Sequence, residues 1–320
     1  MTGKKIRALV LLSGGLDSIL VVKLLLEQGI EVETVNFRTN FCGPSKARPA
    51  AKMLGVPLRE IDIRWEFIEV LKKPKHGYGA GLNPCIDCHA LMLKKAGEIM
   101  RAEGIDLVAT GEVLGERPMS QHKKALEIVE QEAGLGGYLL RPLSAKLLEP
   151  TIPEKDGRVN REKLLDISGR SRQRQMELAK RYDIKEYPTP AGGCALTQKD
   201  FAGKLKKLME NKPDFTPDDL DLIKIGRHFW LATPNPPVGG EGESYSIQII
   251  LGRNQEENEI LKSAKQAGDT YLTPLNFFGP SALIKGCQGD KFISQAKEFI
   301  VQFSPKAKGR GLNQLTFEIE

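Results

Sequence analysis

Residues 6–18 read IRALVLLSGGLDS, an apolar run, interrupted only by Arg7, that passes directly into a glycine-rich turn. A continuous apolar strand is typical of a parallel sheet that is covered on both faces. The two glycines allow a sharp turn, and the helix expected next offers N–H groups and a positive dipole to an anion. A tight turn without a ligand is the alternative. The polar side chains of the loop favour a site for ATP and Mg²⁺, with the phosphates near Ser13, Gly14, Gly15 and Ser18 and the metal ion on Asp17.

The rest of the first half alternates short apolar runs with helical periods. Strands are expected at residues 31–37, 58–63 and 106–110, and helices at 19–27, 47–54, 65–71 and 88–103. This alternation predicts an α/β fold with a doubly wound parallel sheet, in a domain of residues 1–200. Beyond it, a short basic helix and a strand-rich region with many turn residues predict a smaller α+β C-terminal domain, residues 201–320.

The composition is that of a mildly basic globular protein, with 47 Lys and Arg against 41 Asp and Glu in 320 residues. Five cysteines without a secretion signal predict reduced thiols in a cytoplasmic protein. The apolar runs are shorter than the roughly 18 residues that a membrane helix needs, so no membrane partner is expected. Only four histidines are present, which disfavours a catalytic triad or a site with several His ligands.

Most of the positive charge lies in one basic helical segment, residues 158–181, where eight Lys and Arg face three acids. Such a segment is either a solvated helical face or a surface that contacts nucleic-acid phosphates. In the second case Arg170, Arg172 and Arg174 are the candidate RNA contacts.

The carboxyl ends of parallel strands form the ligand-binding edge of such a sheet. Asn36 and Phe37 end the second expected strand and are positioned to meet adenine. Thr110 and Gly111 end the fourth and are expected to face the phosphates or a base. Cys42 follows the second strand on the same side. It is either a fourth thiol near the site or, as we interpret it, a loop cysteine.

Residues 83–88 read NPCIDC and place two thiols at the start of an expected helix. That spacing lets Cys85 and Cys88 reach one metal centre, and Cys194 follows two glycines in a loop that can fold back. Three thiolates suit a cubane cluster with one open iron, whereas the same thiolates with His89 could hold zinc. A redox or persulfide pair without metal is the third alternative.

The loop lacks the lysine of a Walker-type loop, which disfavours a kinase or GTPase of that type. Instead, SGGLDS at residues 13–18 resembles the signature of the PP-loop ATP pyrophosphatases. This resemblance implies that a substrate oxygen attacks the α-phosphate of ATP and that a nucleophile then displaces AMP. NPCxxC followed by a distant Gly-Cys is similar to the iron–sulfur-dependent tRNA thiolation enzymes. It implies a [4Fe-4S] cluster on Cys85, Cys88 and Cys194, with a sulfide on the open iron.

Residues 110–121, TGEVLGERPMSQ, and residues 140–144, LRPLS, resemble the catalytic half of tRNA 4-thiouridine synthetases. The implied activity is ATP-dependent thiolation of a tRNA uridine at its 4-carbonyl, with Asp17 and the three cysteines as catalytic residues. The sulfur donor would be sulfide or a persulfide from a cysteine desulfurase, and a homodimer is compatible with the sequence. The alternatives are a PP-loop amidotransferase, a small-molecule sulfur transferase, a persulfide-relay enzyme, and a non-catalytic RNA-binding module.

Known 4-thiouridine synthetases carry ferredoxin-like and THUMP domains ahead of the loop, which here starts at residue 13. We therefore expect tRNA docking by the basic segment and the C-terminal domain. In that domain LGRN at residues 251–254 and FGPSALI at residues 278–284 are similar to the RNA-binding domain of NFACT proteins of ribosome quality control. This implies phosphate contacts by Arg253 and Lys285. Phe277 and Phe278 either stack on bases or belong to the core, and Cys287 is interpreted as structural.

Overall fold

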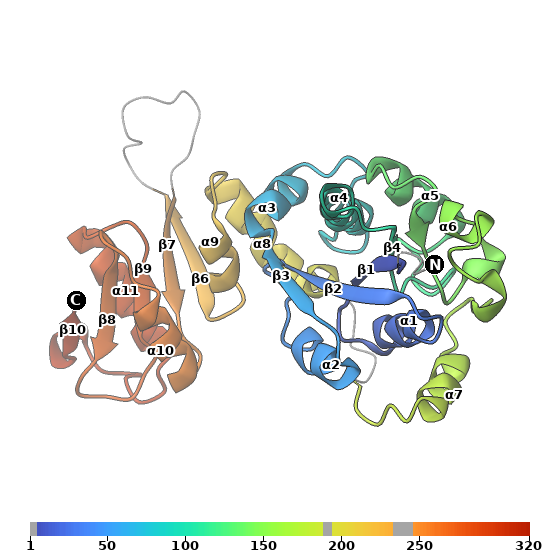
Figure 1. Ribbon diagram of the computed structural model, residues 1–320. Helices are drawn as coiled ribbons and strands as arrows, with labels where there is room; N and C mark the ends of the chain where they lie inside the picture. Colours follow the sequence, from blue (N-terminus) through green and yellow to red (C-terminus); the bar gives the residue numbers. More distant parts are fainter. Residues whose placement is uncertain (1–4, 188–193, 233–245) are drawn as a thin grey trace. The chain divides into compact units, whose positions relative to one another are not determined.

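The computed structural model describes residues 5–187, 194–232 and 246–320, so the two glycines ahead of Cys194 lie outside the described residues. The chain divides into two compact units, Met1–Gln198 and Lys199–Glu320 (Figure 1). Among the helices in these ranges, none is both long and apolar enough to cross a membrane.

The N-terminal unit is built on a five-stranded parallel sheet with the strand order β3-β2-β1-β4-β5. Its strands are β1 (Arg7–Leu11), β2 (Glu31–Arg38), β3 (Leu58–Asp62), β4 (Leu107–Ala109) and β5 (Leu139–Leu140). The chain first builds the sheet outward from β1 to β3, then returns to the other side of β1. The direction therefore switches at β1, and a ligand crevice is expected at its carboxyl end. The predicted doubly wound parallel sheet is confirmed.

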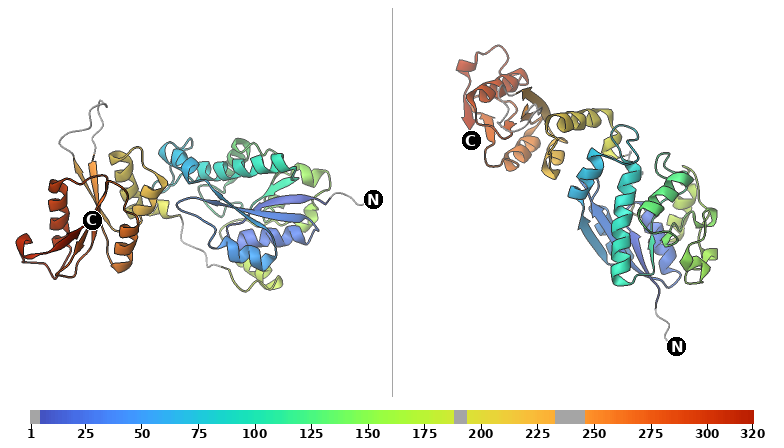
Figure 2. Two further views of the ribbon diagram at one scale, coloured as in Figure 1. Left: turned by 60° about the vertical axis from the view of Figure 1, so that its left-hand side comes forward. Right: turned by 90° about the horizontal axis from the view of Figure 1, so that it is seen from above.

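Helices cover both faces of this sheet (Figure 2). One core is shared by α1 (Leu16–Leu26), α2 (Ala47–Leu54) and α7 (Gln173–Arg181), and the other by α4 (Cys85–Glu103) and α5 (Lys123–Glu132). The unit also contains α3 (Arg64–Lys72) and the single turn α6 (Ile152–Lys155). Because the sheet, α2 and α7 all pack on α1, that helix is apolar on nearly every side.

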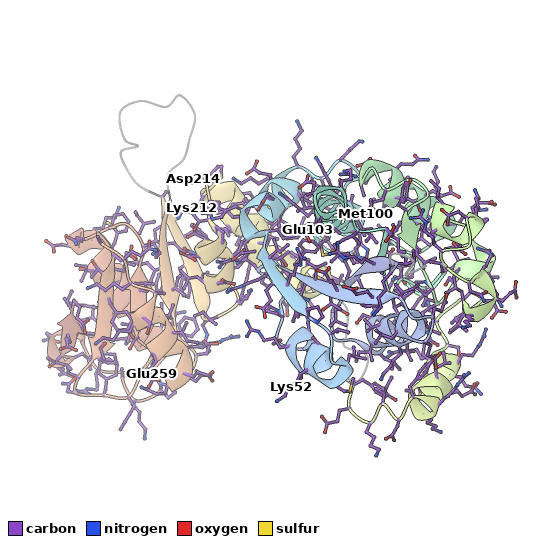
Figure 3. The ribbon with its side chains drawn as sticks, viewed as in Figure 1. Lys52, Met100, Glu103, Lys212, Asp214 and Glu259 are labelled. Atoms are coloured by element: carbon purple, nitrogen blue, oxygen red, sulfur yellow. The ribbon has the colours of Figure 1, made fainter. Side chains whose placement is uncertain are left out.

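Two elements differ from the expectation in ways that matter for the site. Helix α4 begins at Cys85, three residues earlier than expected, so both cysteines of NPCIDC lie in its first turn. Its last turn carries Met100 into the core, while Glu103 reaches out to form an ion pair with Arg59 of β3 (Figure 3). Within the basic segment only α7 is an α-helix; Arg161–Lys163 form a 3₁₀ turn, and Gly169, at a φ of +80°, lies between the two.

The C-terminal unit is a five-stranded antiparallel sheet with the order β10-β8-β9-β7-β6. Its elements are α8 (Lys199–Asn211), α9 (Pro217–Leu222), β6 (Arg227–Ala232), β7 (Ser246–Leu251), α10 (Gln255–Ser263), β8 (Thr270–Pro274), β9 (Ala282–Ile284), α11 (Asp290–Gln302) and β10 (Phe317–Ile319). Helix α11 packs on one face through Ala296 and Ile300, and α10 packs on the other through Leu261. The predicted α+β class of this unit is confirmed.

Candidate active site

A pocket of about 460 Å³ opens at the carboxyl ends of β1, β2 and β4. It collects most of the residues that the sequence singled out in the N-terminal unit. The predicted residues that line it are Ser13, Gly15, Asp17, Ser18, Asn36, Phe37, Cys85, Cys88, Thr110, Gly111 and Cys194. Side chains that are up to 181 positions apart in sequence therefore face a single cavity.

The loop after β1 leaves backbone donors available to a ligand. Gly15 occupies the N-cap position of α1 without a side-chain cap, so the first N–H groups of the helix are not capped by that side chain. The Ser18 hydroxyl donates to the Gly15 carbonyl at 2.8 Å and lies 3.2 Å from the Ser13 hydroxyl. Gly14 has a φ of +79°, and a Cβ there would lie 2.2 Å from the Lys46 carbonyl oxygen. Only glycine fits that position.

The strand ends on either side of this loop are packed tightly against it. Asn36 on β2 donates its amide to the Leu12 carbonyl at 2.8 Å, which ties β2 to the loop. Its Oδ1 atom is buried and has no partner among the described residues, so it can accept a hydrogen bond from a ligand in the pocket. On the other side, a Cβ on Gly111 would lie 2.7 Å from the Ser18 backbone nitrogen. The adenine and phosphate roles of these residues remain predictions.

Two carboxylates, Asp17 and Glu116, lie near each other at the wall of the pocket. Burial raises the pKa of Asp17, and the neighbouring Arg172 offsets part of this effect. Burial and the charge of Asp17 raise the pKa of Glu116. Two neighbouring carboxylates that repel each other are suited to bind a divalent cation together with nucleotide phosphates. Glu116 was not singled out from the sequence, although it belongs to the segment TGEVLGERPMSQ.

Four thiols line the same pocket. Cys85 and Cys88 project from the first turn of α4, Cys194 comes from the segment before α8, and Cys42 from the loop after β2. Cys42, interpreted from the sequence as a loop cysteine, thus lies in a loop and also at the pocket. Burial raises the pKa of Cys85, Cys88 and Cys194, so these thiols favour the neutral form until a cation or an acceptor draws off the proton. Within the described ranges, no three His, Cys, Asp or Glu side chains form a ready-made metal site.

A buried ionic chain supports the floor of the pocket. Glu112, 5% exposed, hydrogen-bonds to His89 Nδ1 at 2.8 Å, to Arg141 Nε at 3.0 Å and to the Thr110 hydroxyl at 3.1 Å. Arg141 continues the chain to Glu130 at 2.9 Å. Burial alone would raise the pKa of Glu112, but Arg141 and His89 lower it to about 2. The chain explains why TGE and LRPLS occur together: it joins the end of β4 to the segment after β5.

The candidate RNA contacts fall into different environments. Arg170 is exposed, and Arg174 pairs with Asp166 at 2.7 Å on the surface. Arg172 is only 17% exposed in its side chain and lies 3.7 Å from Asp17. In the other unit, Arg253 pairs with Glu257. The role of these arginines in RNA binding stays a prediction.

The remaining residues singled out in the C-terminal unit also have defined surroundings. Lys285 forms an ion pair with Asp269 at 2.6 Å. Phe277 packs edge-on against Phe317, whereas Phe278 is 86% exposed. Cys287 packs beside the sheet core.

The strand order, the glycine loop at the switch point and the pocket over it form the kind of crevice in which doubly wound α/β domains bind ligands. Residues 3–146 match the family model described as thiamine biosynthesis protein (ThiI). This match lies within the N-terminal unit and covers a little less than half of the chain.

Curated relatives carry names from tRNA modification. The tRNA-specific 2-thiouridylase MnmA of Syntrophotalea carbinolica is 34% identical over 129 residues, which cover 35% of this chain and 36% of that protein. The protein of the same name from Chloroflexus aurantiacus is 28% identical over 280 residues, covering 77% and 73%. The chain spans 56% of the tRNA-specific 2-thiouridylase MnmA 1 of Syntrophus aciditrophicus, at 29% identity over 63% of this chain.

A solved structure described as a 4-thiouridine synthetase–RNA complex with bound ATP has a TM-score of 0.38 and 20% identity. It covers 67% of this chain and 53% of that one.

Proposed function

We propose that this protein is an ATP-dependent tRNA uridine sulfurtransferase that acts at the 4-carbonyl of its target base. One observation carries the proposal: the phosphate-binding loop and four thiols face a single pocket. An enzyme that only activates a substrate with ATP needs the loop but not the thiols. Joining both in one cavity suits a reaction in which activation and sulfur delivery occur at the same carbon.

The residues of the pocket divide this reaction into two steps. In the first, the uridine carbonyl oxygen attacks the α-phosphate of ATP, and pyrophosphate leaves. The uncapped N–H groups of α1 would bind the phosphates, and Asp17 and Glu116 would bind the Mg²⁺. The Asn36 side-chain oxygen would accept a hydrogen bond from the adenine amino group. In the second, sulfur attacks the activated carbon and AMP leaves. The target base has to leave its stack to enter the pocket.

The thiols fit an iron–sulfur cluster by their chemistry. Cys85, Cys88 and Cys194 would hold a [4Fe-4S] cluster, which when bound supplies an iron site for sulfide. Zinc is the alternative, and it would require His89 Nε2, because Nδ1 bonds to Glu112. Anaerobic purification should yield a brown protein that contains iron and acid-labile sulfide. A colourless protein that contains zinc would contradict the cluster, and one without metal would favour a persulfide on the same thiols.

The 2-carbonyl of the uridine is the alternative position for the sulfur. Both uridine carbonyls flank the same ring nitrogen, so the same two steps would convert the 2-carbonyl. The curated relatives are named 2-thiouridylases, which favours 2-thiouridine as the second candidate product. We further propose tRNA as the substrate, the cytoplasm as the place of reaction, and sulfide or a desulfurase-derived persulfide as the sulfur donor.

Nucleoside mass spectrometry of tRNA from a deletion strain tests the function. We expect one thionucleoside to disappear, and its chromatographic identity distinguishes 4-thiouridine from 2-thiouridine. The wild-type chain and Cys287→Ser should restore it, whereas Asp17→Ala and Cys88→Ser should not. In vitro, Cys88→Ser should still release pyrophosphate with tRNA, because its ATP loop is intact. Unchanged thionucleosides together with turnover of a free small substrate would instead identify a small-molecule sulfur transferase.

A further inference from the structure

A group of buried polar atoms at the phosphate-binding loop lacks partners. Asp17 Oδ1, Arg172 Nε and both polar atoms of the Gln175 amide are inaccessible to solvent and have no hydrogen-bond partner among the described residues. Gln175 is 0% exposed, and its amide lies beside the Asp17 carboxyl without reaching hydrogen-bond geometry. Buried polar groups in folded proteins are nearly always paired, so a cluster of four such atoms indicates a ligand that supplies the missing partners.

The chain path explains how these atoms meet. Helix α7 packs on α1, which carries Asp17 in its first turn. Arg172 is the N-cap residue of the nine-residue helix α7, and its side chain makes no cap hydrogen bond. Gln175 lies in the first turn of the same helix. A helix N-terminus, a guanidinium and a buried amide therefore converge beside the loop that follows β1.

The pairing of Arg172 with Asp17 is loose. The nearest N–O distance is 3.7 Å, which is too long for a hydrogen bond. A structural ion pair between two mostly buried side chains would be expected to close to direct contact. The arrangement instead fits two groups that are each available to a ligand: Asp17 can bind a cation and Arg172 can bind an anion.

We propose that Arg172, Gln175 and the N-terminus of α7 bind the β- and γ-phosphates of ATP and hold the pyrophosphate that leaves. This inference rests on the proposed use of ATP. A diphosphate with its Mg²⁺ would satisfy the Arg172 and Gln175 donors and give Asp17 its cation. Arg172 would then neutralise charge on the phosphates that depart, while Arg170 and Arg174 remain available to tRNA.

Calorimetric titration of the full chain with α,β-methylene ATP and Mg²⁺, compared with AMP, tests this assignment without any tRNA. Arg172→Ala should weaken binding of the ATP analogue by about tenfold or more and leave AMP binding within about twofold, because AMP has no β- or γ-phosphate. Gln175→Leu should likewise weaken binding of the ATP analogue more than binding of AMP. Lys180→Ala, exposed in the last turn of α7, is the matched control and should leave both affinities unchanged.

Arg172→Lys keeps a positive charge at the same place and should retain part of the preference for the ATP analogue. Equal weakening of the ATP analogue and AMP in Arg172→Ala, with a lowered melting temperature, would show a structural role and overturn the proposal. If Arg172→Ala left both nucleotide affinities unchanged but weakened tRNA binding, Arg172 would be an RNA contact, and the proposed phosphate site would be wrong. A wild-type chain that binds neither nucleotide would refute the ATP function itself. A wild-type chain that shows the expected nucleotide affinities but no tRNA thiolation would contradict the proposed function and still support the phosphate site.

Discussion

Among single residues, Glu112 shows how one buried carboxylate can organise a site. It receives hydrogen bonds from a strand end and from Arg141, and it is hydrogen-bonded to Nδ1 of His89, which faces the pocket. A buried charge of this kind is tolerated only because its partners satisfy it, and removing one partner leaves the others unpaired. The segments TGE and LRPLS therefore have a structural role beside the site.

The depressed pKa of Glu112 predicts a pH dependence of folding. The pKa of Glu112 is about 2 in the folded protein, below the ordinary value of 4.5, because Arg141 and His89 stabilise the charged carboxylate against the effect of burial. A carboxyl with a lowered folded-state pKa contributes stability above its unfolded pKa, and that contribution is lost as the pH falls from about 4.5 to about 2. Chemical denaturation across this range should show a smaller loss of stability in Glu112→Gln than in the wild type.

At neutral pH the same variant should be less stable than the wild type by about 3–5 kcal/mol, because the buried Arg141 loses the charge of Glu112 and keeps only Glu130 as an ionised partner. Glu127→Gln, an exposed change on α5, is the matched control and should behave like the wild type at every pH. Equal pH profiles for Glu112→Gln and the wild type would contradict the ionised state of Glu112.

At the scale of elements, the loop between β1 and α1 depends on a close approach by the N-terminus of α2. Gly14 passes the Lys46 carbonyl in a left-handed conformation, and there is no room for a Cβ. The turn that exposes the N–H groups of α1 is thus held from outside by another helix. The conformation of the glycine loop therefore depends on β1, α1 and α2 together and not only on its own six residues.

Gly14→Ala should therefore lower stability by more than about 1–2 kcal/mol, the cost of the backbone conformation alone, and reduce ATP affinity. Gly203→Ala is a suitable control, because Gly203 lies within α8 with no atom near its would-be Cβ. That change should be neutral or stabilise by about 0.5–1 kcal/mol. Thermal melting and ATP titration measure both effects. A Gly14→Ala protein with unchanged stability and affinity would disprove the steric argument.

At the scale of the whole molecule, the positive charge is unevenly divided. Residues 199–320 hold 16 Lys and Arg and 16 Asp and Glu, so the net charge of +6 belongs to the N-terminal unit. Long-range attraction of tRNA should then come from the unit that carries the proposed ATP site. The C-terminal unit would contribute through contacts of shape and stacking, for which the exposed Phe278 is the candidate.

We expect Arg170→Ala with Arg174→Ala to weaken tRNA binding and to reduce its salt dependence. Each lost phosphate contact should lower the slope of log affinity against log salt by about one. The matched control is Lys52→Ala on α2, where the exposed ammonium has no ion pair in the described parts of the chain (Figure 3). Filter-binding or anisotropy titrations at several salt concentrations measure the slope. An unchanged slope would identify the basic segment as a solvated face.

The sequence by itself determined the doubly wound sheet, the phosphate loop and the thiol pair at the start of α4. These features are local: strand and helix periods, a glycine turn and a CxxC spacing act within a few residues. Packing between distant segments decided the rest. It brought Cys42 and Glu116 to the pocket, and it placed Arg172 beside Asp17 because α7 packs on α1. A charge pattern cannot show which arginine turns inward, since burial depends on the surface against which its helix packs.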